Sequence, residues 1–233
     1  MPEDIVRTEL RDGVTLIRID DGKANGLSSS VIAALHQALD QAEKEASAAV
    51  IAGREGRFSG GFDLATMRSG PEAVRTLVTE GAHLLLRIHE CPFPVVAACT
   101  GHAVAAGALL LLVSDARVGM RGEFKIGLNE VAIGMALPIF AMEFARHRLS
   151  KRHFVPATSQ ARLYAPDEAV DAGFLDRVVA PEEVVDAACA EAARLGALPQ
   201  PGFGLTKRSA NGGVAATIRE TLEEDMAKLT GPR

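Results

Sequence analysis

Two glycine-rich segments of the chain could bind an anion through their backbone. Residues 101–108 lead into the apolar run 109–113, and residues 58–64 follow a candidate strand at 48–52. Small residues let the backbone approach a ligand closely, and the first N–H groups of a helix have no partner within it. Two such loops can place two N–H donors on one oxygen and so form an oxyanion hole. Either loop alone is more typical of an ordinary turn between a strand and a helix.

A third segment, residues 124–134, carries a single carboxylate, Glu130, among apolar residues and glycines. Its neighbours Leu128, Val131 and Ile133 predict partial burial of the side chain. Burial raises the pKa of a carboxyl group, which makes the carboxylate a better general base near neutral pH. The plainer interpretation of a glutamate in a charged protein is a solvated surface group.

The three segments, in this order and spacing, resemble those of the crotonase (enoyl-CoA hydratase/isomerase) superfamily. The resemblance covers nearly the whole chain, and its other parts are residues 23–28, 94–98, 164–169 and 173–179. It implies an α/β fold, a crotonase-type spiral of repeated ββα units, followed by a helical C-terminal region. The pattern of strand and helix signals agrees, because candidate strand pairs are followed by amphipathic helices several times along the chain.

The resemblance also implies roles for three residues. By the family motifs, the N–H groups of Gly60 and Ala106 hold the oxygen of a thioester, and Glu130 is the catalytic acid–base residue. The sequence Leu128-Asn129-Glu130 matches the motif of mitochondrial-type Δ3,Δ2-enoyl-CoA isomerases. Removing a proton beside a thioester carbonyl builds negative charge on its oxygen, and two preorganised N–H donors stabilise that enolate.

The informative departure from the family is Leu109. Enoyl-CoA hydratases carry a second catalytic glutamate at this position, and their two carboxylates together activate a water. A single carboxylate can still take a proton from C2 and return it to C4. We therefore expect Δ3,Δ2-enoyl-CoA isomerase activity, with enoyl-CoA hydratase as the alternative. A low-activity acyl-CoA-binding protein of the crotonase type is a further alternative.

Coenzyme A is expected as part of the thioester substrate, with no tightly bound cofactor and no metal. By resemblance, Lys23 and Ala24 lie beside its nucleotide, Phe58 belongs to the binding loop, and Lys207 is the lysine that C-terminal helices of the family often supply. His102 is more typical of a packing residue than of a catalytic one. Asp63 is expected to cap the helix that follows it.

Two other enzyme classes fit the sequence poorly. A serine protease of the related spiral fold would need a nucleophile at the position of Ala106, and Ser59 lacks a recognisable histidine and acid. A dinucleotide enzyme would need a glycine motif between an early strand and a helix, whereas residues 202–204 are the nearest match and lie late in the chain.

Composition places the chain in a broad class. The 25 basic and 30 acidic residues give a net charge of −5, which argues against nucleic acid as the main partner. No apolar run approaches the ~20 residues of a membrane span, so no membrane insertion is expected. Three cysteines without metal spacing favour a reduced, cytoplasmic protein.

The chain is expected to divide into a core, residues 1–180, that contains the active site, and a helical oligomerisation region, residues 181–233. Helices are predicted near 181–195, 198–210 and 214–229, with glycines at 196 and 212–213 as helix stops. In the family this region builds trimers that often pair, so the resemblance implies a homotrimer or a dimer of trimers.

Overall fold

The larger of two sheets frames the molecule. The computed structural model describes residues 5–230, and this sheet has the strand order β1-β2-β3-β5-β7-β9. Strands β1 and β2 are antiparallel, and all other neighbours are parallel. Its strands are β1 (Val6–Arg11), β2 (Val14–Ile19), β3 (Ala48–Ala52), β5 (Val95–Cys99), β7 (Ala116–Met120) and β9 (Arg177–Val179).

A smaller parallel sheet stands beside the first. It consists of β4 (Gly56–Ser59), β6 (Gly101–Val104) and β8 (Ile126–Gly127). In three successive units, β3–β4, β5–β6 and β7–β8, the first strand joins the large sheet and the second joins the small one. This repetition confirms the expected spiral of stacked ββα units.

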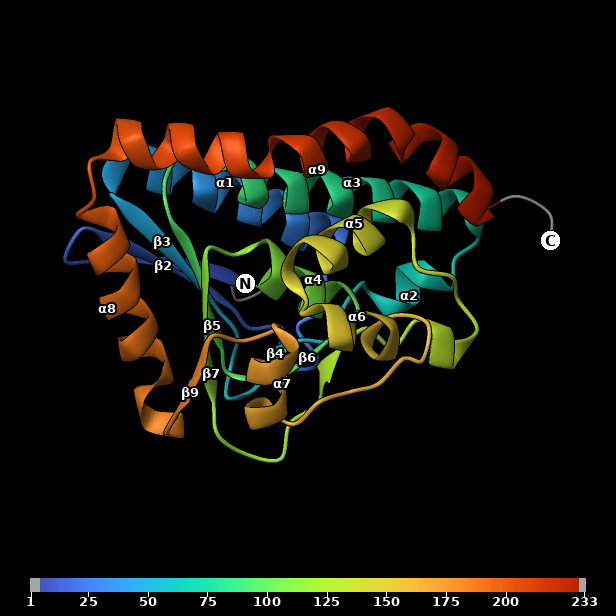
Figure 1. Cartoon of the computed structure of the whole chain (residues 1–233), viewed down its shortest axis with the longest axis horizontal. Coiled ribbons are helices and arrows are strands. Elements are labelled where there is room, and N and C mark those ends of the chain that lie inside the picture. The colour runs from blue at the N-terminus through green and yellow to red at the C-terminus, as the bar shows by residue number, and fades with distance from the viewer. Residues whose placement is uncertain (1–4, 231–233) are drawn as a thin grey trace.

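Helices cover both faces of the large sheet (Figure 1). Val50 packs in the cluster that includes α8, whereas its neighbour Ile51 faces the larger cluster with α1, α3 and α4, as strand alternation requires. The helices are α1 (Ser29–Glu45), α2 (Leu64–Met67), α3 (Pro71–Glu90), α4 (Ala106–Val113), α5 (Ile139–Arg148), α6 (Lys151–Ala157), α7 (Pro166–Ala172), α8 (Val184–Gly196) and α9 (Gln200–Thr230), with short 3₁₀ turns η1 (Val131–Ile133) and η2 (Pro181–Glu183).

The C-terminal helices differ from the sequence prediction. Helix α9 runs without a break through Gly212 and Gly213, where a helix stop was predicted. It lies along α3 (Figure 1) and buries Ile218 and Met226 in the main core. Two interior glycines cost about 1 kcal/mol each. Burial of this apolar face outweighs that cost.

Three further observations concern membrane-spanning helices, metal-binding groups and the pairing of cysteines. Among residues 5–230, no helix combines the length and apolar character needed to cross a membrane. The same part of the chain has no group of three or more His, Cys, Asp or Glu residues placed to hold a metal ion. All three cysteines are free; Cys91 and Cys99 are buried, and Cys189 is half-buried.

Candidate active site

The three segments selected from the sequence meet at one edge of the small sheet. Gly60 follows β4, Ala106 follows β6, and Glu130 follows β8, so all three come after the carboxyl ends of neighbouring parallel strands. This edge is where open parallel sheets bind ligands. The N–H of Ala105 donates to the carbonyl of Gly127 at 3.0 Å, which joins the second segment to the third.

The first loop corrects one predicted donor. The N–H of Gly60 donates to the carbonyl of Ala24 at 2.8 Å, so it is not free to hold a ligand oxygen. Two residues further on, the N–H of Phe62 has no acceptor among residues 5–230. Gly61 lies between them with φ +92°, and a Cβ added there would be 3.3 Å from the nitrogen of Ala106. Phe62 therefore replaces Gly60 as the candidate partner of Ala106.

The second loop presents the N–H of Ala106 at the first position of α4. Ala105, just before it, has φ +51° and ψ −127°, a backbone conformation that alanine rarely adopts. Such strained residues cluster at functional sites. The carbonyl of Ala105 accepts the N–H groups of Ala108 and Leu109 and so begins the helix. Because the N–H of Ala106 lies in the first turn, it has no intrahelical partner. Ala106 stays a candidate donor, as predicted.

A buried asparagine, which the sequence reasoning did not single out, holds the first loop in place. The side chain of Asn25 donates to the carbonyls of Ile19 and Phe58, at 2.8 and 3.2 Å, and it is fully buried. Its φ of +53° marks a strained turn in the motif that contains Lys23 and Ala24. In the sequence, the signal that could have identified this residue is an asparagine inside the motif of residues 23–28.

Close packing fixes the two donor loops against each other. A Cβ at Gly107 would lie 2.3 Å from the carbonyl oxygen of Ser59, so only glycine fits there. The ring of Phe62 packs on Gly81 of α3, where an added Cβ would lie 2.3 Å from a ring carbon. Both contacts preorganise the backbone around the candidate donors.

Glu130 has the environment of a general base. Its Oε2 atom is buried and, within residues 5–230, has no hydrogen-bond partner. Burial raises the pKa of its carboxyl group to about 7, and nearby backbone N–H groups only partly oppose this shift. Its own carbonyl accepts the N–H groups of Ile133 and Met135, at 3.1 and 2.9 Å, which fixes the backbone that carries it.

The cause of that burial differs in part from the one predicted. Leu128 is fully buried, but Val131 and Ile133 are 42% and 61% exposed. They lie in the short turn η1, which presents them to the surface of this single chain. Contrary to the prediction from the sequence pattern, Val131 and Ile133 are therefore not buried together with the carboxylate.

Leu109 is 2% exposed and belongs to the apolar helix α4. Every residue of α4 is apolar or glycine, so this helix brings no carboxylate to the site. The chain thus offers Glu130 from the third segment and no second acid at the position that departs from the family.

The residues expected to bind coenzyme A have different environments. Lys23 and Ala24 are exposed beside the first loop, and the carbonyl of Lys23 accepts a hydrogen bond from the Nε–H of Arg54 at 3.0 Å.

The other two residues are buried. Phe58 lies in the core, where it cannot touch a ligand. The Nζ atom of Lys207 forms an ion pair with Asp115 at 2.6 Å and donates a hydrogen bond to the carbonyl of Ile88. Lys23 and Ala24 therefore stay candidates for the coenzyme A site, whereas Phe58 and Lys207 are buried and have structural roles.

Two polar residues near the loops are structural. Asp63 accepts the N–H of Thr66 at 2.8 Å and caps α2, as predicted. His102 accepts the N–H of Lys125 through Nδ1 at 3.0 Å and packs edge-on against Phe124. Neither residue is placed here as an acid or base.

Comparison with known proteins identifies the family. A family model described as enoyl-CoA hydratase/isomerase matches residues 9–229. The chain belongs to this enoyl-CoA hydratase/isomerase (crotonase) family, and its fold is the crotonase fold. The relatives of this chain within the family are named as enzymes, and this chain is an enzyme as well.

Individual relatives carry both activities in their names. The solved structure of an enoyl-CoA hydratase/isomerase family protein from Pseudomonas syringae is 42% identical, with a TM-score of 0.95, and covers 98% of this chain and all of that one. An enoyl-CoA hydratase from Mycobacterium ulcerans is 37% identical, with a TM-score of 0.91, and covers 95% and 99%. The mouse mitochondrial enoyl-CoA delta isomerase 1 is 28% identical over 97% of this chain and 80% of its own length.

Proposed function

We propose that the chain is a Δ3,Δ2-enoyl-CoA isomerase, which converts 3-enoyl-CoA thioesters into 2-enoyl-CoA thioesters. The observation that carries this proposal is the combination of one half-buried glutamate, Glu130, whose Oε2 atom is buried without a partner in the described residues, with a buried leucine at position 109. The mouse relative named as an isomerase supports it. A comparison of 3-enoyl-CoA and 2-enoyl-CoA as substrates tests it directly.

Each residue of the site has one role in this reaction. The Glu130 carboxylate takes a proton from C2 of the substrate, and the electrons of that C–H bond move toward the thioester oxygen. The N–H groups of Phe62 and Ala106 stabilise the resulting dienolate oxygen, an effect worth about 2.7–4 kcal/mol per donor in comparable sites. The protonated Glu130 then returns the proton to C4, and the double bond comes to lie between C2 and C3.

Hydration is the second candidate function, because the Mycobacterium ulcerans relative is named as a hydratase. Adding water across a 2-enoyl thioester requires a water held and activated beside the double bond. The buried hydrocarbon side chain of Leu109 has no group that can hold that water. A protein that only binds acyl-CoA is the third candidate, and turnover of 3-enoyl-CoA by the wild type excludes it.

The substrate itself supplies coenzyme A in this account, and no tightly bound cofactor takes part. Lys23 and Ala24 are exposed beside the first loop, where the backbone and an ammonium group can meet the nucleotide end of the ligand. A free cation near a phosphate is a favourable pairing at the protein surface. The three free cysteines fit a reducing compartment such as the cytoplasm.

We further propose a homotrimer or a dimer of trimers for the assembly. Apolar side chains are exposed in this single chain on α9 and beside Glu130, where Leu205 is 63% and Ile133 61% exposed. A subunit interface would cover such residues. Sedimentation at micromolar concentration should give three or six copies, and a clean monomer would refute the assembly.

A further inference from the structure

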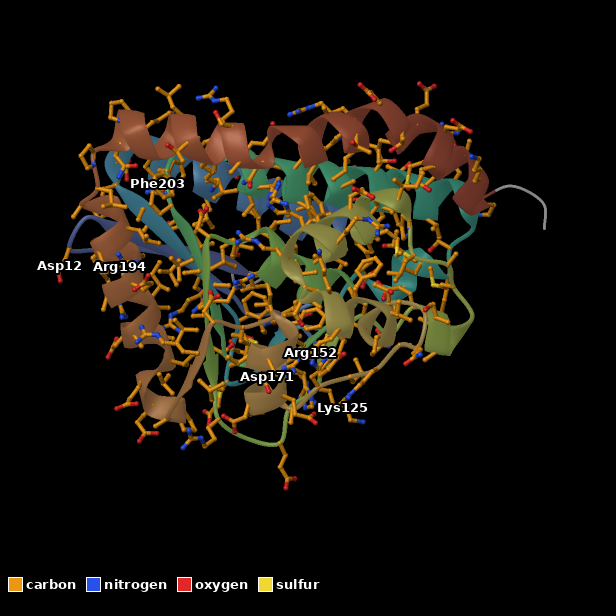
Figure 2. The ribbon with its side chains drawn as sticks, in the orientation of Figure 1. Asp12, Lys125, Arg152, Asp171, Arg194 and Phe203 are labelled. Carbon is orange, nitrogen blue, oxygen red and sulfur yellow. The ribbon has the colours of Figure 1, made fainter. Side chains whose placement is uncertain are left out.

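Two adjoining cavities lie at the corner where α8 leads into α9, beside the start of β7. One has a volume of about 580 Å³ and the other of about 410 Å³. They share three lining residues, Asp115, Arg148 and Leu195, so the two cavities lie next to each other and are together called the groove here. Figure 2 shows Phe203 on α9 and Arg194 on α8 at this corner; the first lines the larger cavity and the second the smaller.

The larger cavity has mainly apolar walls. They are formed by the end of α8, the turn between the helices and the first turns of α9, with Leu195, Leu198, Pro199 and Phe203 as the main apolar residues. Leu198 is 42% exposed at the rim. Such a wall suits a hydrocarbon chain, because burial of apolar surface on both sides is favourable.

The smaller cavity is lined by four arginines and three carboxylates. Arg117 pairs with Asp176, and Arg194 pairs with Glu191 at 2.6 Å. The third carboxylate, Asp115, is paired with Lys207 at 2.6 Å. The other two arginines, Arg148 and Arg177, form no salt bridge within residues 5–230.

Arg148 is the arginine that both cavities share. Its Nε and Nη2 atoms donate to the carbonyls of Leu112 and Ser114, at 3.1 and 2.8 Å, and within residues 5–230 its Nη1 has no acceptor. Burial, followed by the neighbouring charge of Arg117, lowers the pKa of Arg148, and the charges of Asp115 and Asp176 oppose this shift in part. An anion in the groove would accept a hydrogen bond from the Nη1 atom, which has no acceptor in the described part of the chain.

We propose that this groove is a binding site for a medium-chain carboxylate, with its head group at Arg148 and its hydrocarbon tail between Leu198 and Phe203. The site is separate from the candidate active site. Helix α4 begins at the donor Ala106, and its C-terminal end leads to the two carbonyls that hold Arg148. Eight residues at 1.5 Å each separate the two ends by about 12 Å. The inference does not depend on which reaction the enzyme catalyses.

Decanoate is the probe, and its binding to the full-length protein is measured by titration calorimetry. Decanol lacks the charge and acetate lacks the tail, so both should bind at least about tenfold more weakly than decanoate. Ala210, exposed on α9, lines the larger cavity, and Ala210→Trp should fill it and weaken decanoate binding by a similar factor. Ala216→Trp, at an exposed position on the same helix but outside the cavity lining, is the matched control.

A second variant tests the head group. Arg148→Gln removes the charge and should also weaken decanoate binding about tenfold, while decanol binding stays unchanged. Circular dichroism and sedimentation check that each variant keeps the fold and the assembly of the wild type. Equal binding of decanoate and decanol, or unchanged decanoate binding in folded Ala210→Trp, would overturn the proposal. Loss of assembly in Ala210→Trp alone would also overturn it, because the groove would then be an interface between copies.

Discussion

The N–H of Ala105 donates to the carbonyl of Gly127 at 3.0 Å, and this bond ties the start of α4 to the segment that carries Glu130. One partner directly precedes the candidate donor Ala106, and the other lies three residues before the candidate base. The position of the oxyanion donor is thereby coupled to the position of the carboxylate. Replacement of either segment would disturb both parts of the proposed proton transfer.

Glu130→Gln should remove the base while keeping the shape of the side chain. We expect turnover to fall at least about 100-fold, because general base catalysis typically contributes that much or more. Binding of an acyl-CoA ester should change little. Glu123→Gln, at an exposed carboxylate of the segment before Glu130, is the matched control and should keep wild-type turnover. Unchanged kcat in Glu130→Gln would remove Glu130 from the mechanism.

The pH dependence should follow the raised pKa of Glu130. Only the carboxylate can accept the C2 proton, so kcat/KM should be level above about pH 8, half-maximal near the pKa of about 7, and fall about tenfold per pH unit well below it. A profile governed by an ordinary carboxyl pKa near 4 would contradict the buried base.

The same pKa predicts a cost in stability. Between the unfolded pKa of about 4.3 and the folded pKa of about 7, the folded protein holds a proton that the unfolded chain releases. Stability of the wild type is therefore lost as pH rises through this window. Glu130→Gln lacks this loss, so at pH 8 it should be the more stable protein, by about 3–4 kcal/mol in chemical unfolding. Identical pH profiles of unfolding would argue that the carboxyl group is solvated.

A structure with an acyl-CoA analogue should identify the oxyanion donors. We expect the thioester oxygen at about 2.7–3.1 Å from the nitrogens of both Phe62 and Ala106. The N–H of Gly60 should stay on the carbonyl of Ala24, where this structure places it. An oxygen bound by Gly60, with Phe62 turned away, would restore the donor that the sequence motif suggested.

Lys207 should matter for stability and not for substrate binding. Lys207→Met leaves Asp115 buried without its partner, and breaking a buried ion pair in this way costs about 3–5 kcal/mol. The exposed pair Lys228–Glu224 is the control, because Lys228→Met should cost less than about 1 kcal/mol. KM for the acyl-CoA substrate should be the same in folded Lys207→Met and wild type; a large rise in KM would return Lys207 to the coenzyme A site.

The sequence motifs located the three site segments because each follows a strand and is rich in small residues. They did not determine which N–H of the first loop is free. That depends on the carbonyl of Ala24, which comes from a segment 36 residues before Gly60 and whose position is set by the buried Asn25. Likewise, Gly212 and Gly213 are local helix breakers, and only the packing of α9 on α3 makes that helix continuous. Both the free N–H of the first loop and the continuity of α9 depend on contacts between segments that are far apart in the sequence.

The central claim is that one carboxylate shuttles a proton at a site where Leu109 leaves no place for a catalytic water. The most direct measurement compares initial rates of one wild-type preparation on 3-enoyl-CoA and 2-enoyl-CoA thioesters of several chain lengths. Formation of 2-enoyl-CoA from 3-enoyl-CoA, with slow or absent hydration of 2-enoyl-CoA, is the predicted result. Efficient hydration of 2-enoyl-CoA with no conversion of 3-enoyl-CoA would contradict it, and would mean that a residue other than Leu109 positions the attacking water.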